Sequence, residues 1–469
     1  MNRRSFNQLV ASLAATPFVM PMRANSQAPT SPLLVEARRK PDQPWQTYET
    51  RILAHLKGVR SPKRDLNRYG GIPSDKTKKT GFWHPEKIDG RFWMVDPDGG
   101  LNVHRAVCSV TVGRGERNTA AYNKKFRTKE AWTKATAALL RENGFNGTGA
   151  WSDTALLAAE ANLAFCLNLN LMSGYGRKRG GTYQKPGHTG YPNDCIFAFD
   201  PEFAAYCEQY AADTLPTYRN NPNFFGYFSD NEMPLGIKTL DNYLSIDNPN
   251  DPGRLASEAW IKERNLSREA LNDEARQEFI GFMVDKYMSV ISNAIRKHDP
   301  NHLVLGPRLH SSDKDKTQLM QSVARHADII SYNLYGVWTP PEKYTKGWME
   351  LTGKPFMITE WYTKGEDSGM GNTTGAGWNV RTQKDRGLFY QNYTLALIEC
   401  KNCVGWHWFK YQDNDPTAKG VDPSNIDSNK GIVDNDFEPY TDLVAAMREI
   451  NSSVFDIIEY FDSNGKPSM

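Results

Sequence analysis

Short apolar runs of strand length alternate along the chain with longer stretches of helical periodicity. The runs cover residues 102–110, 144–151, 164–171, 224–234, 302–306, 328–333, 355–359 and 404–409. One intervening stretch, residues 273–297, places Ile280, Val284 and Tyr287 on one face of a helix. Eight strands that alternate with helices predict an α/β fold of the (β/α)8 TIM barrel type over about residues 101–455. A doubly wound open sheet is the alternative, although no glycine-rich nucleotide fingerprint supports it.

The segment before the first barrel strand contains two glycine-rich turns, at residues 88–90 and 96–100. Aromatic and apolar residues flank both turns, which predicts a small N-terminal β-meander able to close the floor of the barrel. The polar residues 27–79 are expected to form an arm over the surface, with a short helix near residues 48–57. The predicted divisions are a leader (1–26), an arm and meander (27–100), the barrel (101–455) and a C-terminal tail (456–469).

Three long connections, residues 233–271, 361–386 and 410–431, follow the C-terminal ends of predicted strands. The connections that lead from helices back to strands are short. Barrel enzymes build their substrate sites from long loops at the C-terminal rim of the barrel. This asymmetry therefore indicates which end of the barrel carries the function.

The first 26 residues have the features of an export signal. Arg3 and Arg4 precede an apolar run at residues 9–20, and small residues follow at positions 24–26. Paired arginines ahead of such a run are typical of the twin-arginine pathway, which predicts a periplasmic or secreted protein cleaved near Ser26. The alternative is that this segment is only a basic tail.

Charge and composition narrow the class of partner. The chain has 57 basic and 54 acidic residues, and cleavage near Ser26 would remove three arginines and no acid, which leaves a neutral protein. This balance gives no electrostatic footprint for nucleic acid. The 12 tryptophans and 21 tyrosines suit a protein that stacks rings on sugars, and no apolar run is long enough to span a bilayer. A neutral carbohydrate polymer is the favoured partner, and the sequence does not define an oligomeric state.

No cofactor or metal site is expected. The six cysteines are too few for a disulfide scaffold. Cys400 and Cys403 form a single CxxC pair without the second pair of a structural zinc site, and a bridge between them is the alternative. The run Asp413-Asn414-Asp415 lacks the bidentate glutamate of an EF-hand, so calcium binding is the weaker interpretation.

Two of the predicted strands end in carboxylates. Asn231 and Glu232 close the fourth strand, and Glu360 closes the seventh. In a parallel barrel these side chains meet at one rim, where one carboxyl group can protonate a departing glycosidic oxygen while the other attacks the anomeric carbon. The structural alternatives are a helix-start carboxylate for Glu232 and a buried ion pair for Glu360. The joint occurrence of the two acids favours catalysis.

Several segments resemble those of the β-agarases of glycoside hydrolase family 50, within the large clan of retaining enzymes with (β/α)8 barrels. They are EKIDGRFWMVDP at 86–97, WSD at 151–153, GYFSDNE at 226–232, ITEWY at 358–362, TQKDRG at 382–387 and GWHWFKY at 405–411. The resemblance implies an enzyme that cleaves β-galactosidic bonds of agar or a related red-algal galactan.

The resemblance also implies roles for individual residues. Glu232 would be the general acid/base and Glu360 the nucleophile, while Asn231 would hold the sugar 2-hydroxyl. Tyr335, at the end of the sixth strand, would orient the nucleophile. Trp408, late in the eighth strand, would provide a stacking platform for a sugar.

Other residues of the predicted rim are candidates for substrate contact, and their alternative is a structural role at the rim. They are Trp151, Asp153, Arg308, His310, Trp361 and Trp378. His104 and Arg105, on the first strand, are equally well explained as internal polar groups.

Two other functions stay open. The protein could hydrolyse another β-galactan or β-galactoside, such as a porphyran or carrageenan fragment. It could also be a periplasmic glycan-binding protein that has kept the cleft without activity. The intact Asn231, Glu232 and Glu360 count against the second alternative.

Overall fold

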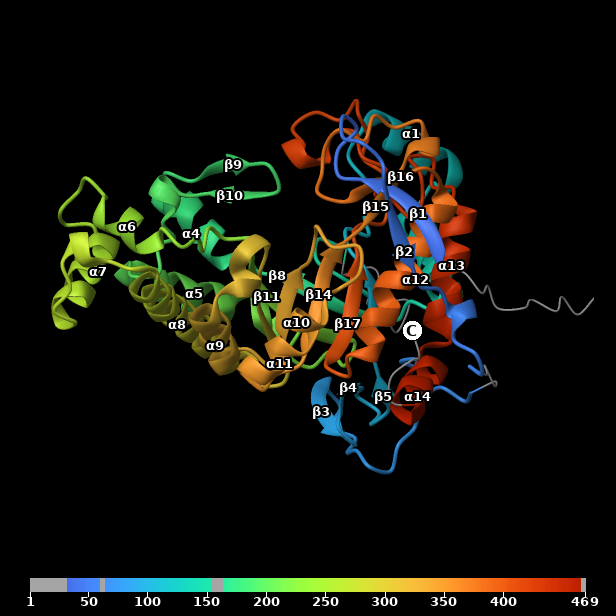
Figure 1. Cartoon of the computed structure of the whole chain (residues 1–469), viewed down its shortest axis with the longest axis horizontal. Helices are drawn as coiled ribbons and strands as arrows, with labels where there is room; N and C mark the ends of the chain where they lie inside the picture. Colours follow the sequence, from blue (N-terminus) through green and yellow to red (C-terminus); the bar gives the residue numbers. More distant parts are fainter. Residues whose placement is uncertain (1–31, 60–63, 154–162, 465–469) are drawn as a thin grey trace, which may run out of the picture.

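The computed structural model describes residues 32–59, 64–153 and 163–464. Eight parallel strands form a barrel at its centre, and helices pack around this barrel (Figure 1). The strands follow one another in the order β12-β11-β8-β7-β6-β17-β14-β13. The predicted TIM barrel is therefore confirmed, while the predicted export signal, residues 1–26, lies outside the described residues.

The barrel closes between its first and last strands in this order. Leu309 and Tyr332 form a parallel bridge there, and the N–H of Leu309 donates to the carbonyl oxygen of Ser331 at 3.0 Å. Every barrel strand coincides with one of the eight apolar runs of the sequence. These strands are β6 (His104–Val107), β7 (Gly147–Thr148), β8 (Ala164–Asn168), β11 (Phe224–Asn231), β12 (Leu303–Arg308), β13 (Ile330–Asn333), β14 (Phe356–Trp361) and β17 (Cys403–Trp408).

Helices connect the strands and shield their outer faces. In α8 (Asp273–His298) the predicted face with Ile280, Val284 and Tyr287 is buried, and the side chain of Asn272 caps the first turn. The other α-helices of the described residues are α1 (Glu116–Lys125), α2 (Lys129–Glu142), α4 (Leu171–Arg179), α5 (Pro201–Thr214), α6 (Thr239–Leu244), α7 (Pro252–Glu263), α9 (Thr317–His326), α10 (Glu342–Thr345), α11 (Gly347–Thr352), α12 (Gln383–Glu399), α13 (Thr441–Ser452) and α14 (Val454–Asn464).

The predicted N-terminal meander is present and closes the floor of the barrel. It consists of the antiparallel strands β3 (His84–Ile88), β4 (Arg91–Val95) and β5 (Leu101–Asn102). Trp83 and Met94 are buried with barrel residues in one apolar cluster. In Figure 1 the meander lies below the barrel, away from the long loops. The opposite rim is therefore the accessible end.

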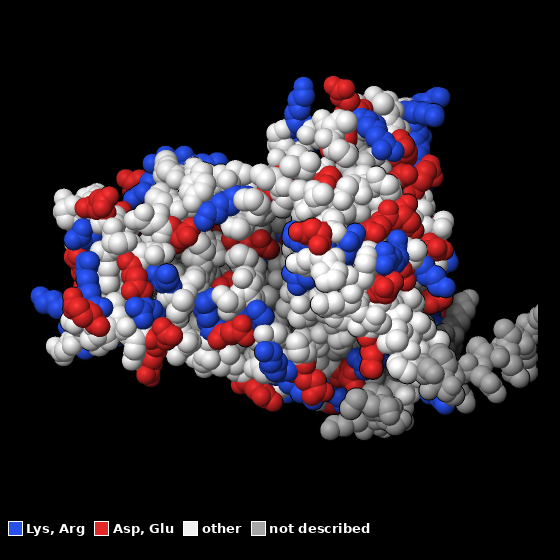
Figure 2. Space-filling model, turned by 45° about the horizontal axis from the view of Figure 1, so that its top comes forward, with Lys and Arg blue, Asp and Glu red and all other residues white. Residues whose placement is uncertain are grey.

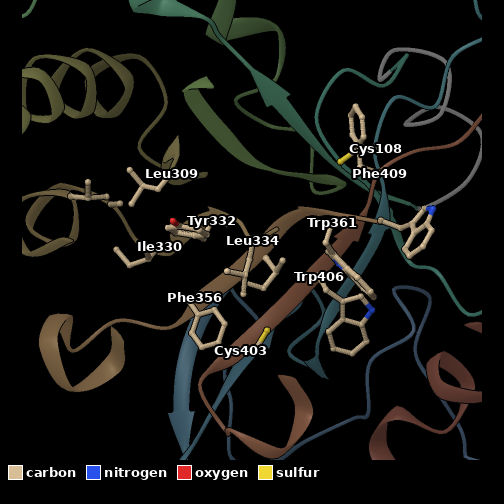
Figure 3. Close-up of a cluster of buried hydrophobic side chains, with 14 of the residues drawn as sticks. Cys108, Leu309, Ile330, Tyr332, Leu334, Phe356, Trp361, Cys403, Trp406 and Phe409 are labelled. Carbon is tan, nitrogen blue, oxygen red and sulfur yellow. The ribbon is translucent and has the colours of Figure 1, made fainter. Parts of the chain in front are cut away.

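A second apolar layer packs between the outside of the barrel and α12. Figure 3 shows Phe356, Trp361 and Trp406 within this layer. The ring of Trp361 stacks on Tyr393 of α12, with ring centroids 4.1 Å apart. Because side chains alternate along a strand, the layer that holds Trp361 outside directs the preceding Glu360 toward the barrel axis.

The N-terminal arm differs from the prediction. Residues 33–50 form an antiparallel hairpin, β1 (Leu33–Arg38) and β2 (Gln46–Thr50), and helical geometry near residues 48–57 is limited to the short 3-10 turn Leu53–His55. Strand β1 also pairs with β16 (Trp378–Val380), which pairs with β15 (Thr363–Gly365). The arm thus completes a four-stranded sheet on the loop that follows β14. This tertiary pairing overrides local helical preference.

The C-terminal segment differs as well. Residues 456–469, predicted as a tail, begin inside helix α14, whose Val454, Ile457, Ile458 and Phe461 are buried. No helix in the described part of the chain combines the length and the apolar character needed to cross a membrane. All six cysteines, including Cys400 and Cys403, are buried free thiols.

Candidate active site

The carboxylate of Glu232 stands immediately after β11. Its backbone has a φ of 49°, in the left-handed region that residues other than glycine rarely adopt. Its N–H donates to the carbonyl oxygen of Arg308 at 3.1 Å, which holds this turn against β12. The side chain lines the cleft at the rim. Backbone strain of this kind is typical of functional sites.

Glu360 lies near the end of β14, and its carboxylate accepts a hydrogen bond from the same side-chain amide as the carboxylate of Glu232. The Nδ2 atom of Asn333, at the end of β13, donates to Oε1 of Glu232 at 2.9 Å and to Oε2 of Glu360 at 3.1 Å. The hydroxyl of Thr359 donates to Oδ1 of Asn333 at 2.9 Å, which fixes the orientation of the amide. Two acids remote in the chain therefore face one shared space.

The guanidinium of Arg308 forms hydrogen bonds with residues at the ends of β11 and β14. It donates to Oε2 of Glu360 at 2.9 Å and to Oδ1 of Asn231 at 2.8 Å. The side chain is fully buried, and its guanidinium lies 4.3 Å from the ring centre of Trp151. Arg308 therefore orients Glu360 and Asn231, which fits the structural alternative that the sequence left open for it.

Tyr335 and the surrounding charges set the protonation of the acid pair. The hydroxyl of Tyr335 donates to Oε1 of Glu360 at 2.8 Å, as the resemblance implied. Burial raises the pKa of Glu360 to about 7; the charge of Arg308 opposes this rise, and the charge of Glu232 adds to it. Because two close carboxyl groups resist simultaneous ionisation, the pair holds one proton near neutral pH.

These groups line a cleft of about 1240 Å³ at the rim of the barrel. Trp151, Asn231 and His310 line it together with the two acids, and the indole of Trp151 is 37% exposed. Figure 2 shows acidic and basic side chains interspersed over this side of the molecule. A cleft with exposed aromatic surface and hydrogen-bonding groups is suited to an uncharged polar ligand such as a sugar chain.

Two of the predicted aromatic platforms lie behind the rim. Trp408 and Trp361 are 0% and 1% exposed, and their rings meet edge to face with centroids 5.2 Å apart. The residue that follows each of them, Phe409 and Tyr362, lines the cleft instead. Neither tryptophan presents a face to a bound sugar, so the platform role predicted for them is not supported.

Two further candidates do not line the cleft. Asp153 is half-buried beside Trp151, and its N–H donates to the carbonyl oxygen of Val110 at 2.9 Å. The indole N–H of Trp378 donates to the carbonyl oxygen of Val337 at 3.1 Å, which pins the loop after β14. Both positions fit the structural alternative.

The cleft residues that were not identified from the sequence include Asn333, Lys430 and Arg39. Lys430 is buried, and its ammonium group lies 4.9 Å from the ring centre of Tyr362 and donates to Asn425 Oδ1 at 2.7 Å. Burial lowers the pKa of Lys430 well below its usual range. Arg39 reaches the cleft from the N-terminal arm. The rule that identified Glu232, a polar residue at the end of a barrel strand, also applies to Asn333 and could have identified it.

Two groups of side chains were tested as metal sites. His104, Cys166 and His407 cluster inside the barrel, but Nδ1 of His104 and Nε2 of His407 lie 2.8 Å apart and form a hydrogen bond with each other. The carboxylate of Asp413 accepts hydrogen bonds from Asn429, from the N–H of Gly431 and from Tyr440. Nδ1 of His104, Nε2 of His407 and the carboxylate of Asp413 thus have protein partners, whereas Nδ1 of His407, Oδ1 of Asn414 and Oδ2 of Asp415 are buried without one in the described part of the chain. His104 is an internal polar group.

The chain is similar to curated proteins of known sequence. It is 25% identical to β-agarase B of Vibrio sp. (strain JT0107) over 493 residues, which cover 82% of this chain and 50% of that protein. It is also 25% identical to β-agarase A of the same strain over 372 residues, which cover 70% of this chain and 36% of that protein. The chain therefore spans about half the length, or less, of these relatives, and no family model matches it.

Solved structures provide a fuller match. BpGH50 superposes with a TM-score of 0.82 at 32% identity and covers 92% of this chain and 96% of its own. An exo-β-agarase superposes with a TM-score of 0.70 at 20% identity, over 87% of this chain and 69% of its own, which supports the fold alone. The name BpGH50 denotes glycoside hydrolase family 50, and the match extends over nearly the whole of both chains. The chain belongs to glycoside hydrolase family 50.

Proposed function

We propose that the protein is a retaining glycoside hydrolase that cleaves β-galactosidic bonds of agar or a related red-algal galactan. The observation that carries this proposal is the single amide of Asn333, which contacts the carboxylates of both Glu232 and Glu360. The similarity to two β-agarases supports the choice of galactan.

The spacing of the acids favours retention of configuration. Both carboxylate oxygens bond to one nitrogen atom, so they are separated by at most the sum of the two distances, about 6 Å. Retaining enzymes place their carboxyl groups about 5–5.5 Å apart, whereas inverting enzymes leave about 6.5–9.5 Å for an intervening water. The bound on the oxygen separation suits direct attack by Glu360.

The hydrogen bonds assign the two roles. Glu360 accepts from Arg308, Asn333 and Tyr335, and donors of this kind stabilise a carboxylate. Glu232 shares only Asn333 with this set of donors, so we assign it the role of the acid. Glu360 then attacks the anomeric carbon while Glu232 gives its proton to the departing sugar oxygen. In the second half, Glu232 takes a proton from water, and the resulting hydroxide oxygen displaces Glu360 from the anomeric carbon.

The substrate contacts follow from the cleft lining. Asn231 sits beside Glu232 and is held by Arg308, which suits the proposed hydrogen bond to the sugar 2-hydroxyl. Trp151, which is 37% exposed, supplies aromatic surface at the rim. No cofactor is needed for this chemistry.

The test is hydrolysis of a panel of neutral and sulfated agar oligosaccharides, porphyran fragments and carrageenan fragments. We expect β-galactosidic cleavage of an agar-type substrate, with the first-formed product in the β configuration by NMR. Cleavage of only porphyran or carrageenan fragments would move the substrate class to another β-galactan. Binding without any product would favour a glycan-binding protein, and a first-formed α product would overturn the retaining mechanism.

We also propose that the protein is exported to the periplasm or secreted through the twin-arginine pathway, on the basis of Arg3 and Arg4 ahead of an apolar run. Replacement of both arginines by lysine should leave the protein in the cytoplasmic fraction. Unchanged export of the double variant would contradict this pathway.

A further inference from the structure

A small hairpin reaches across the top of the cleft to the general acid. Strands β9 (Tyr183–Lys185) and β10 (His188–Gly190) form this hairpin, and Gly187 lies at its tip. The carbonyl oxygen of Gly187 accepts a hydrogen bond from Nδ2 of Asn231 at 3.4 Å. In Figure 1 the hairpin extends over the barrel toward the loop that follows β17.

Asp422, in that loop, fastens the tip of the hairpin from the far side. Its carboxylate accepts from the N–H of Gly187 at 2.8 Å and from Nε2 of Gln184 at 2.6 Å. The same carboxylate accepts from the N–H of Ser424 at 2.7 Å, so Asp422 is itself fixed within its loop. Gly187 has a φ of 90°, which glycine adopts without strain. The position of the hairpin is therefore defined from both sides of the cleft.

The hairpin brings a second histidine to Glu232. Nδ1 of His188 lies 3.9 Å from Oε2 of Glu232, and Nδ1 of His310 lies at the same distance from the same oxygen. The two imidazole rings are 5.6 Å apart between centroids. The other oxygen, Oε1, is occupied by Asn333. Oε2 is therefore the oxygen that is free to carry and deliver the proton, and both histidines face it.

We propose that His188 is a positioning residue for the general acid, which keeps the proton-bearing oxygen of Glu232 aimed at the departing sugar. This inference rests on the proposed function. A neutral imidazole nitrogen accepts a hydrogen bond from a protonated carboxyl group after a shift of less than one ångström, since about 3 Å is the ordinary length of such a bond. An acceptor of this kind favours the protonated form of the acid.

Burial favours the neutral ring of His188, and the charged groups around it act in both directions. Burial lowers the pKa of His188, and His310, after β12, lowers it as well. Glu232, after β11, opposes this shift; Lys185, on the same hairpin, adds to it, and Asp422 opposes it. A neutral ring stabilises the protonated acid, whereas an imidazolium would attract its carboxylate and favour loss of the proton. The imidazole of His188 can therefore accept the proposed hydrogen bond from Glu232 near neutral pH, and it loses this ability when it becomes protonated.

The experiment compares two leaving groups. An agar oligosaccharide needs a proton on its departing sugar, whereas a 2,4-dinitrophenyl β-glycoside of the same glycosyl unit does not need one. For His188→Ala we expect kcat/KM on the oligosaccharide to fall about tenfold or more, within the range for general acid catalysis. We expect the rate on the dinitrophenyl glycoside to stay within about twofold, and His188→Gln, which keeps an acceptor, to recover part of the loss.

The pH profile gives a second readout. Loss of an acceptor that favours the protonated acid should move the alkaline limb of kcat/KM to lower pH by about half a unit or more. His326→Gln, on the surface of α9 and paired with Asp285, is the matched control and should match the wild type. Equal losses on both substrates, or no loss on either, would overturn the inference.

Two more variants distinguish a wrong role for His188 from a wrong proposed function. Asp422→Ala releases the tip of the hairpin and should reproduce the leaving-group dependence of His188→Ala, because the position of His188 depends on this contact. Glu232→Ala should itself show a large loss on the oligosaccharide and a small loss on the dinitrophenyl glycoside. If Glu232→Ala lowered the rates on the two substrates equally, the proposed function would be wrong. If Glu232→Ala lowered mainly the rate on the oligosaccharide while His188→Ala and Asp422→Ala did not, only the role of His188 would be overturned.

Discussion

The two carboxylates of the site are held in different ways. Glu360 is 9% exposed and accepts hydrogen bonds from Arg308, Asn333 and Tyr335, all of which lie at or just beyond the ends of barrel strands. Glu232 shares only Asn333 with that set, and its second oxygen faces two histidines, one of them on a hairpin outside the barrel. Residues at the ends of the barrel strands thus position the proposed nucleophile, while the surroundings of the proposed acid include a residue from a loop. Variation in the loops can change leaving-group chemistry without disturbing the nucleophile.

The largest expected effect comes from removal of the proposed nucleophile. Glu360→Gln should lower kcat/KM by about four orders of magnitude or more on both the oligosaccharide and the dinitrophenyl glycoside, because the covalent route is lost for either leaving group. Steady-state kinetics on the two substrates measure this. Glu263→Gln, at a side chain 78% exposed on α7, is the control. Near-normal turnover by Glu360→Gln on its best galactan would end the assignment.

Replacement of the shared amide should affect both acids at once. In Asn333→Ala each carboxylate loses a donor, and the hydroxyl of Thr359 loses its buried acceptor. We expect kcat to fall about 100-fold, the usual result of deleting one preorganised donor, with a loss of about 1–3 kcal/mol in the free energy of unfolding. A rate loss below about threefold in a folded variant would mean that the amide does not couple the two acids.

A charge change behind the nucleophile should move the pH optimum. Arg308 lowers the pKa of Glu360, so Arg308→Gln should raise this pKa above its present value of about 7. Attack requires the carboxylate, and the acid limb of kcat/KM should therefore move to higher pH. Arg308→Lys keeps the positive charge and should move this limb less. An unchanged acid limb in a folded Arg308→Gln variant would contradict the electrostatic role.

The smallest effect concerns stability. The pKa of Glu360 is raised from 4.5 to about 7 in the folded protein, so the folded state binds a proton that the unfolded chain releases. The wild type should lose stability as pH rises from about 4.5 to about 7, by up to about 3 kcal/mol, and Glu360→Gln should lack this loss. Denaturant titrations at pH 5 and pH 8 compare the two proteins. A difference in stability that did not grow with pH would exclude this linkage.

Most of the fold was accessible from the sequence, because a buried parallel strand is a short apolar run and the barrel repeats it eight times. The rule that strand ends meet at one rim brought Glu232 and Glu360 together. The arm was harder to predict: β1 lies between β2 and β16, and β16 is more than three hundred positions away in the sequence, with Ala37 paired to Val380. The secondary-structure propensities of residues 33–50 do not indicate a pairing partner so distant in the sequence.

The errors in the site have a simple physical origin. In Glu360-Trp361-Tyr362, side-chain alternation along β14 places the tryptophan on the face opposite the acid, and Trp408 lies beside Trp361 in the register of β17. Alternation could have predicted this outcome, whereas aromatic character alone could not. The hairpin that carries His188 was not predictable, since its position depends on a contact with Asp422 from a distant loop.

The pairing of Ala37 with Val380 also sets an order of events during synthesis. At about 5–20 residues per second, roughly 20 to 70 s separate the emergence of the two partners from the ribosome. The edge of β1 that faces β16 therefore stays unpaired until seven of the eight barrel strands have been made. The edge that β1 finally covers belongs to the loop after Glu360, so the surroundings of the proposed nucleophile are completed only when segments made far apart in time join.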